Sequence, residues 1–186
     1  MQVTHTVNGV DIDRLLGTID AIKSDPALAK FQFRVRNEWI DGAHARATIK
    51  DFYGAGQEDT SRTEPFVVDV DEPPVLLGTN QAPSAGEYLL HALAACVTGT
   101  VVYHAAARGI ELEGLECSVE GDVDLRGFLG LAEGVRPGYE NIRVTLSAAG
   151  DLDDDQLATL AELTRFSPMR DTVNNPVPVA IEVVRG

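Results

Sequence analysis

The stretch APSAGEYLLHALAACVTGTVVYHAAARGI, residues Ala82–Ile110, decides the fold of this chain. Good helix formers dominate it from Glu87 to Arg108, and Gly109 follows where a residue of positive φ commonly ends a helix. Apolar side chains point to nearly every side of that helix. Because a helix that is apolar all round is buried, we expect a buried central helix over residues 87–108.

The segments before this helix predict one short helix and several strands. Apolar residues at three- and four-residue steps indicate an amphipathic helix that ends at Ser24-Asp25-Pro26. Asp41-Gly42 between two strand-like stretches is a strong hairpin signal. The expected elements are a helix from Ile12 to Ile22, strands at residues 31–40 and 43–50, a loop at 54–64 and a short strand at 66–70.

After the central helix, the spacing of apolar residues changes between a period of two, typical of strands, and a period of 3.6, typical of helices. Apolar and polar residues alternate in two stretches, and a Gly-rich connection separates them. The expected elements are strands at 115–125 and 142–147, a helix at 151–166, a short helix after Ser167-Pro168, and a last strand at 177–183, which Pro176 and Pro178 indicate to be an edge strand. The fold class is therefore α+β, in one domain.

Composition narrows the function classes. The chain has 186 residues, with 15 Lys and Arg against 29 Asp and Glu, so its formal net charge is -14. This deficit of positive charge argues against nucleic acid and anionic membrane surfaces as partners. Two cysteines are too few for a disulfide scaffold, and no run of about 18 apolar residues or secretory signal is recognised. We expect an acidic, soluble, cytoplasmic protein.

Cys96, on the central helix, is the first candidate for chemistry. An unpaired cysteine on a buried helix is usually a small hydrophobic residue. Its helical neighbours are Ala92, Leu93, Gly99 and Thr100, none of which is a base or a cation. Activation of this thiol would therefore have to come from another element or another chain. Cys117 lies on the apolar side of its strand, where packing is the better account, and the spacing leaves a Cys96–Cys117 disulfide open.

Glu87 has two interpretations. Ser84-Ala85-Gly86-Glu87 matches a helix capping box. As a partner of Cys96 it meets a geometric objection, because nine residues of ideal helix separate the two by about 13 Å on opposite sides. The four histidines form no metal-binding spacing, and no phosphate loop, dinucleotide fingerprint or nucleophile elbow is present, so no metal and no cofactor are expected.

A family resemblance adds to this interpretation. Residues 78–99 (GTNQAPSAGEYLLHALAACVTG), with VEGDVDLRGFLGL, VRPGYENIRV and SPMRDTV further on, resemble the OsmC/Ohr superfamily as a set, from about Phe31 to Val184. The resemblance implies antiparallel sheets wrapped around a long buried central helix, in an intertwined homodimer. It also implies a helical N-terminal extension over residues 1–30 and an OsmC-like domain over residues 31–186, with a single domain overall.

The resemblance implies an activity and a site. Characterised members are thiol-dependent peroxidases that reduce organic hydroperoxides at sites on the subunit interface. The peroxidatic cysteine corresponds to Cys96, and a family glutamate at the start of the same helix corresponds best to Glu87. An organic hydroperoxide or an apolar ligand would bind at the dimer interface, and the alternative function is a dimer that binds a small ligand without turnover.

This chain departs from the family pattern at two places. Ser167 stands before Pro168 where the peroxidases carry a resolving cysteine, so an external thiol or Cys117 would have to reduce the oxidised site. Ile40-Asp41-Gly42 stands near the place of a family arginine that orients the thiolate. Three substitutes lie nearby, and an ordinary two-residue turn would put the first two on the opposite sheet face from the third: Arg34, Arg36 and Arg46.

Overall fold

The computed structural model describes residues 5–175 and 177–186, and these form two compact units. The first unit contains His5 and Asp11–Leu89, and the second contains Thr6–Val10 and Leu90–Gly186. The longest helix, α2 (Ala85–Ala106), begins in the first unit and continues through the second. The division of the chain at residue 30 stays a prediction.

Short strands and one amphipathic helix precede α2. As predicted, α1 ends before Asp25-Pro26, and it begins where the Asp11 carboxylate accepts a hydrogen bond from the backbone N–H of Arg14 at 2.9 Å. The elements are β1 (Thr6–Val7), β2 (Val10–Asp11), α1 (Ile12–Ser24), η1 (Pro26–Ala29), β3 (Arg36–Asp41), β4 (His44–Ile49), β5 (Phe52–Gly54), β6 (Gln57–Asp59), β7 (Phe66–Val70) and η2 (Pro74–Leu76).

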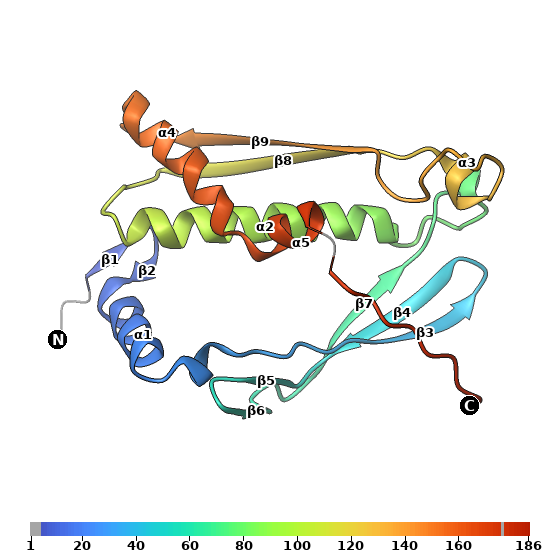
Figure 1. The fold of residues 1–186 in the computed structure, drawn as a ribbon, viewed down its shortest axis with the longest axis horizontal. Helices are drawn as coiled ribbons and strands as arrows, with labels where there is room; N and C mark the ends of the chain where they lie inside the picture. The colour runs from blue at the N-terminus through green and yellow to red at the C-terminus, as the bar shows by residue number, and fades with distance from the viewer. Residues whose placement is uncertain (1–4, 176) are drawn as a thin grey trace. The chain divides into compact units, whose positions relative to one another are not determined.

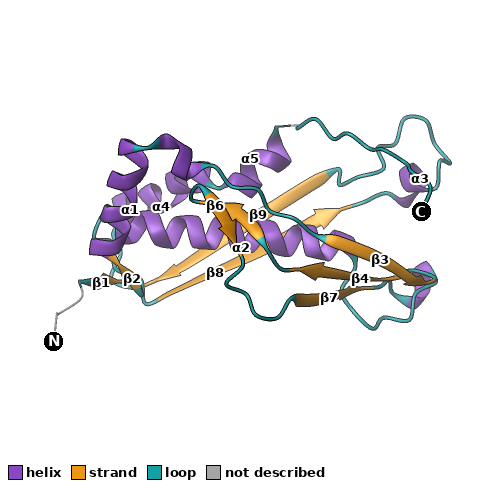
Figure 2. Cartoon of the chain, turned by 90° about the horizontal axis from the view of Figure 1, so that it is seen from below, coloured by secondary structure: helices purple, strands orange, loops and turns teal. Residues whose placement is uncertain are grey.

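The predicted hairpin forms with a shifted register. Strands β3, β4 and β7 make an antiparallel sheet in that order (Figure 2). The turn falls on residues 42–43 instead of 41–42, and the register shifts between Trp39 and Asp41. Glu38 therefore lies opposite Arg46, so that Arg36 and Arg46 share a sheet face. The prediction that these two arginines lie on opposite faces is wrong, because the register shift between Trp39 and Asp41 moves Arg46 opposite Glu38.

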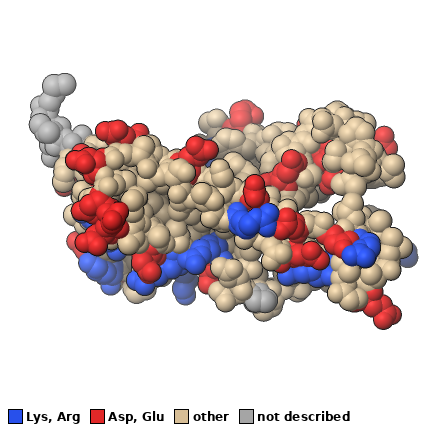
Figure 3. All heavy atoms as spheres, turned by 90° about the horizontal axis from the view of Figure 1, so that it is seen from above, with Lys and Arg blue, Asp and Glu red and all other residues tan. Residues whose placement is uncertain are grey.

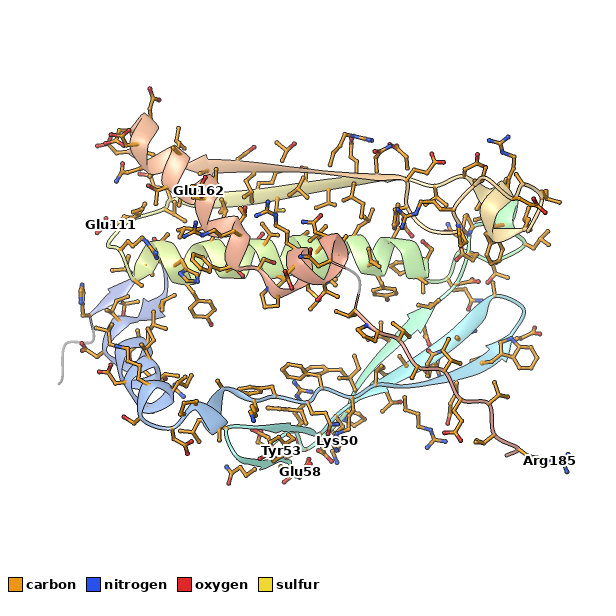
Figure 4. All side chains as sticks on the ribbon, in the orientation of Figure 1. Lys50, Tyr53, Glu58, Glu111, Glu162 and Arg185 are labelled. Atoms are coloured by element: carbon orange, nitrogen blue, oxygen red, sulfur yellow. The ribbon has the colours of Figure 1, made fainter. Side chains whose placement is uncertain are left out.

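The segment predicted as a loop at 54–64 contains part of a second hairpin. Strands β5 and β6 pair around a two-residue turn, in which Ala55 and Gly56 both have positive φ, 51° and 83°. Figure 4 labels Tyr53 and Glu58, which pair across these strands. The prediction missed this hairpin because its strands have three residues each and show no apolar periodicity.

The second unit contains two long strands and a series of short helices. Figure 1 shows β8 and β9 running side by side along α2, with α4 and α5 following in the chain. Both strands alternate in burial as predicted. The elements after α2 are β8 (Gly114–Asp122), α3 (Leu125–Phe128), β9 (Asn141–Ala149), α4 (Asp154–Leu163), η3 (Thr164–Phe166) and α5 (Pro168–Asn174).

The core of this unit joins α2 to α4 and the two strands. Val101 and Ala105 of α2 pack with Leu160 and Leu163 of α4, which face inward as predicted. Leu157, which was predicted to face inward with them, is partly exposed. Gly109 has a φ of 68° after the last turn of α2, as the sequence indicates, although the helix ends two residues earlier than expected.

Helix α2 is buried along one stripe only. Leu93, Val97, Val101 and Ala105 are four residues apart and at most 3% exposed. Tyr103, in contrast, is 57% exposed, and Leu89 is also partly exposed. The sequence predicts burial on nearly all sides of this helix. Within a single chain only one face is buried, and the opposite face is exposed.

The membrane argument from the sequence also needs a correction. Among the described residues, α2 is long and apolar enough to cross a membrane by length and composition, with a mean hydropathy of 1.4 over the best window. The core helix of a soluble protein passes the same test. One stripe of α2 packs against α4 and the strands, and 28% of the best window is buried inside the structure.

The predicted last strand is absent. No strand forms within residues 177–186, where Val179, Ile181 and Val183 are 78%, 86% and 92% exposed. Pro176 lies outside the described residues. An alternating sequence becomes a strand only when a neighbouring strand supplies hydrogen-bond partners, and none does so within this part of the described chain.

The surface carries its charge in a dispersed form. Figure 3 shows Asp and Glu side chains spread over the visible face with Lys and Arg among them, instead of one acidic patch. Two exposed acidic side chains of β8 form ion pairs with Arg143 of β9. Arg143 donates a hydrogen bond to Asp122 at 3.1 Å and lies 3.4 Å from Glu120. The acidic strand face is thus solvated and partly neutralised, as the alternation predicts.

Asp71 is the one described carboxylate that is almost fully buried, at 1% exposure. It follows β7 and accepts hydrogen bonds from the Thr79 hydroxyl at 2.7 Å and from the backbone N–H groups of Glu72, Thr79 and Gln81 at 2.8–3.1 Å. These donors hold the pKa of the Asp71 carboxyl well below its usual value. Asp71 thereby fixes the loop that leads into α2.

We predict that Asp71→Ala lowers the free energy of unfolding by about 2–3 kcal/mol, because four donors lose a buried partner. Since the folded pKa of Asp71 is depressed, its contribution is full above the ordinary aspartate pKa and is lost as pH falls toward the folded value. Urea unfolding at pH 7 and pH 2.5 measures both effects. Glu64→Ala removes an exposed carboxylate from the same unit as the control, and equal losses in the two variants would contradict the assignment.

Candidate functional site

Cys96 meets a serine from a distant part of the chain. The Ser167 hydroxyl donates a hydrogen bond to the Cys96 Sγ with an Oγ–Sγ distance of 3.3 Å. Ser167 is 0% exposed, and Cys96 is half-buried. Helix α2 supplies the thiol and the start of α5 supplies the hydroxyl, so the sulfur sits where two helices of the second unit meet.

Ser167 also caps α5. Its Oγ accepts from the backbone N–H of Arg170 at 3.3 Å, and Pro168 occupies the first helical position. A hydroxyl has one proton and two lone pairs, so both interactions are satisfied at once. The N–H group polarises the hydroxyl toward the sulfur, and such a donor binds a thiolate more strongly than a neutral thiol.

The sequence predicted the helix start at Ser167-Pro168 but not the contact with Cys96. The resemblance alone linked the two positions, by placing a resolving cysteine at 167. In the structure these side chains touch, which is the arrangement that a pair of cysteines exchanging a disulfide requires. With serine at position 167, the side chain still contacts Cys96, but it has no sulfur with which to form a disulfide.

Cys117 occupies a different environment. Its side chain faces inward from β8, as the alternation predicts, and burial raises the pKa of its thiol while a hydrogen bond with Thr98 opposes the shift. Thr98 lies two residues beyond Cys96, or about 200° around α2. Cys117 therefore contacts the side of α2 away from Cys96, and both cysteines are free thiols.

Glu87 forms the predicted capping box in the first unit. Its Oε2 accepts from the backbone N–H and the hydroxyl of Ser84 at 2.7 and 2.9 Å, and the Ser84 Oγ accepts from the Glu87 N–H at 3.3 Å. These bonds hold the pKa of the Glu87 carboxyl below its ordinary value. Glu87 is thus a carboxylate at neutral pH, and its role in catalysis stays a prediction.

The three candidate arginines of the first unit are each engaged by a carboxylate. Arg34 binds Glu58 at 2.6 and 2.8 Å, and Arg46 binds Asp69 at 2.7 and 3.0 Å. Arg36 lies 2.7 Å from its strand neighbour Glu38. To orient a thiolate, any one of these guanidinium groups would have to share or leave its carboxylate.

Metal ligands do not gather anywhere in the described part of the chain. No group of three or more His, Cys, Asp or Glu side chains converges there. Cys96 itself is a half-buried thiol beside a hydroxyl donor.

Comparison with known proteins places this geometry in a family. The family model described as OsmC-like protein matches residues 78–182, which include α2, β8, β9, α4 and α5. No curated protein sequence matches the chain.

Solved structures share the fold at low sequence identity. An OsmC-like protein from Mycoplasma pneumoniae is 16% identical with a TM-score of 0.61, covering 78% of this chain and 89% of its own. An osmotic stress induced and detoxification response protein from Psychrobacter arcticus is 14% identical with a TM-score of 0.57, covering 76% and 88%.

The organic hydroperoxide resistance protein OsmC from Legionella pneumophila is 14% identical to this chain, with a TM-score of 0.54, and the match covers 77% of this chain and 90% of that one. At such identities the likeness shows the fold alone. The family model spans more than half of the sequence, from the loop before α2 to the C-terminal segment. The α+β chain with Cys96 on its long helix therefore belongs to the OsmC-like protein family of the OsmC/Ohr superfamily.

Proposed function

We propose that this protein is a thiol-dependent peroxidase that reduces organic hydroperoxides through Cys96. The observation that carries the proposal is the hydrogen bond from the buried Ser167 hydroxyl to the Cys96 sulfur. It is a donor contact of a kind that the helical neighbours of Cys96 do not provide, and it comes from another element. Family membership and a similar fold in an organic hydroperoxide resistance protein support the same reaction class.

The first half of the reaction oxidises the thiol. The Cys96 thiolate attacks one oxygen of the peroxide, an S–O bond forms and the O–O bond breaks. The sulfur becomes a sulfenic acid, the peroxide is reduced to an alcohol, and one proton is taken up by the leaving alkoxide. The Ser167 hydroxyl holds the thiolate in place before the attack.

The second half needs an external thiol. Ser167 cannot form a disulfide, and Cys117 contacts the opposite side of α2. A first external thiol condenses with the sulfenic acid, releasing water and leaving a mixed disulfide. A second thiol then reduces this bond, which restores Cys96 and yields the external disulfide. A supply of reduced thiol fits the reducing cytoplasm, which we propose as the location.

We further propose that the working form is a homodimer with the site at its interface. A single chain leaves one side of α2 exposed at Leu89 and Tyr103, and it leaves the alternating apolar segment 177–184 without a strand partner. A second copy would cover both features and would exclude water from the thiol. The hydroperoxide, or another apolar ligand, would bind at that interface.

Glu87 enters the proposal as a carboxylate and not as the proton donor. Its capping bonds favour the charged form, so it would orient a cation or water at the site instead of protonating the alkoxide.

A second candidate function is a dimer that binds a small ligand without turnover. This function is favoured because Arg34, Arg36 and Arg46 are each paired with a carboxylate, so none of them is free to bind a thiolate without sharing or leaving that partner. The experiments below separate this function from the peroxidase.

We predict that cumene hydroperoxide oxidises Cys96 much faster than Cys117, because burial makes Cys117 a poor thiolate former. Stopped-flow thiol loss followed by peptide mass spectrometry measures both rates. Cys117→Ser should keep the fast phase, and Cys96→Ser should remove it. A folded dimer in which Cys96 does not react would refute the peroxidase and leave the ligand-binding function.

Ser167→Cys should convert the site into a disulfide-forming pair. The two side chains touch, so one equivalent of cumene hydroperoxide should leave a Cys96 disulfide to the new thiol, with loss of two free thiols per chain. Thiol counting and non-reducing mass spectrometry read this out. Thr164→Cys, three residues before Ser167, is a matched control, and a disulfide forming equally well there would argue against a specific pairing geometry.

Glu87→Gln should separate the cap from the chemistry. Loss of the charge-assisted capping bonds should lower the free energy of unfolding by about 0.5–1 kcal/mol, measured in urea. If Glu87 also serves the reaction, the rate of Cys96 oxidation should fall at least about tenfold, equivalent to about 1.4 kcal/mol in the barrier. Ser84→Ala removes the same cap and is the control. Equal rates in the two variants would restrict Glu87 to the cap.

A further inference from the structure

The second unit contains a partly open cavity of about 600 Å³. Its walls come from α2, β8, β9, α4, η3 and α5, all within one unit of the chain. Cys96 and Ser167 are not among its lining residues.

The lining is chemically one-sided. Aliphatic side chains make up most of it, and no Asp or Glu is among the lining residues. Its three polar members, Thr164, Arg170 and Asn174, all come from the consecutive segment that forms η3 and α5. The cavity therefore has an extended aliphatic wall and a polar side that carries one positive charge.

The guanidinium of Arg170 has no carboxylate partner within the described residues. It donates to the Thr164 hydroxyl at 3.1 Å. The neighbouring Arg165, in contrast, lies 3.7 Å from Glu162 of α4, which Figure 4 labels, and Arg143 binds Asp122. In a chain with a net charge of -14, a cavity-lining arginine without an acidic partner is suited to an external anion.

We propose that this cavity binds a free, unbranched aliphatic carboxylic acid, with its carboxylate on Arg170 and its hydrocarbon chain along the aliphatic wall. The volume lies within the range of small-molecule sites, about 300–1,000 Å³. A carboxylate is ionised at neutral pH and matches the fork geometry of a guanidinium. Leu157 and Val144 of the lining are partly exposed, and a bound hydrocarbon chain would cover them. This site is independent of the Cys96 reaction.

Isothermal titration of the full chain with decanoate, decanol and decylamine tests the proposal. Decanoate should bind at least about tenfold more tightly than decanol, and decylamine most weakly, because only the acid pairs with Arg170. Arg170→Gln should bring decanoate to the level of decanol and leave decanol unchanged, whereas Arg170→Lys should keep the preference for the acid.

Two further variants complete the test. Arg165→Gln removes an equal charge from an exposed neighbouring position and should change neither ligand. Ala161→Phe places a ring on an exposed position of the lining and should weaken decanoate and decanol alike, with circular dichroism to confirm folding. No binding of decanoate, as when a second copy of the chain fills the cavity, overturns the proposal. Binding that is insensitive to both Arg170→Gln and Ala161→Phe also overturns it.

Discussion

The rest of the structure depends on the need to bury α2. This helix is apolar on nearly all sides, and burial of apolar surface contributes about 25 cal/mol per Å². One chain satisfies the need along a single stripe, where Leu93, Val97, Val101 and Ala105 meet α4, β8 and β9. The length of the two strands and the placement of α4 follow from covering that stripe. The exposed remainder of the helix is the physical reason to expect a second copy.

A single hydroxyl connects this packing to chemistry. Ser167 is the N-cap residue of α5. The helix cap therefore fixes its side chain before any ligand binds. The same oxygen then donates to Cys96. A loss of α5 structure would therefore change the surroundings of the thiol, which couples the stability of a seven-residue helix to the candidate site.

Local patterns predicted the elements whose partners lie nearby in the sequence. The end of α1 at Asp25-Pro26, the Ser84–Glu87 capping box and the Ser167 cap all follow from short motifs, and the alternation of β8 and β9 follows from side-chain period. The β3–β4 register did not, because an irregular pair at Trp39 and Asp41 changes which faces the arginines share. Cys96 and Ser167 are in contact although they are 71 positions apart in the sequence, so no local pattern predicts the contact. Only the family resemblance linked the two positions.

The wrong prediction at the C-terminus has the same physical origin as the exposed face of α2. Residues 177–183 have the alternation of a strand, and their apolar side chains are largely exposed in the single chain. A strand is a property of a pair, since its backbone groups need partners at each step. An exposed alternating apolar segment is also an aggregation hazard unless another strand covers it. The sequence pattern and the structure are therefore reconciled if the missing partner belongs to a second copy of the chain, which would cover the segment and α2 together.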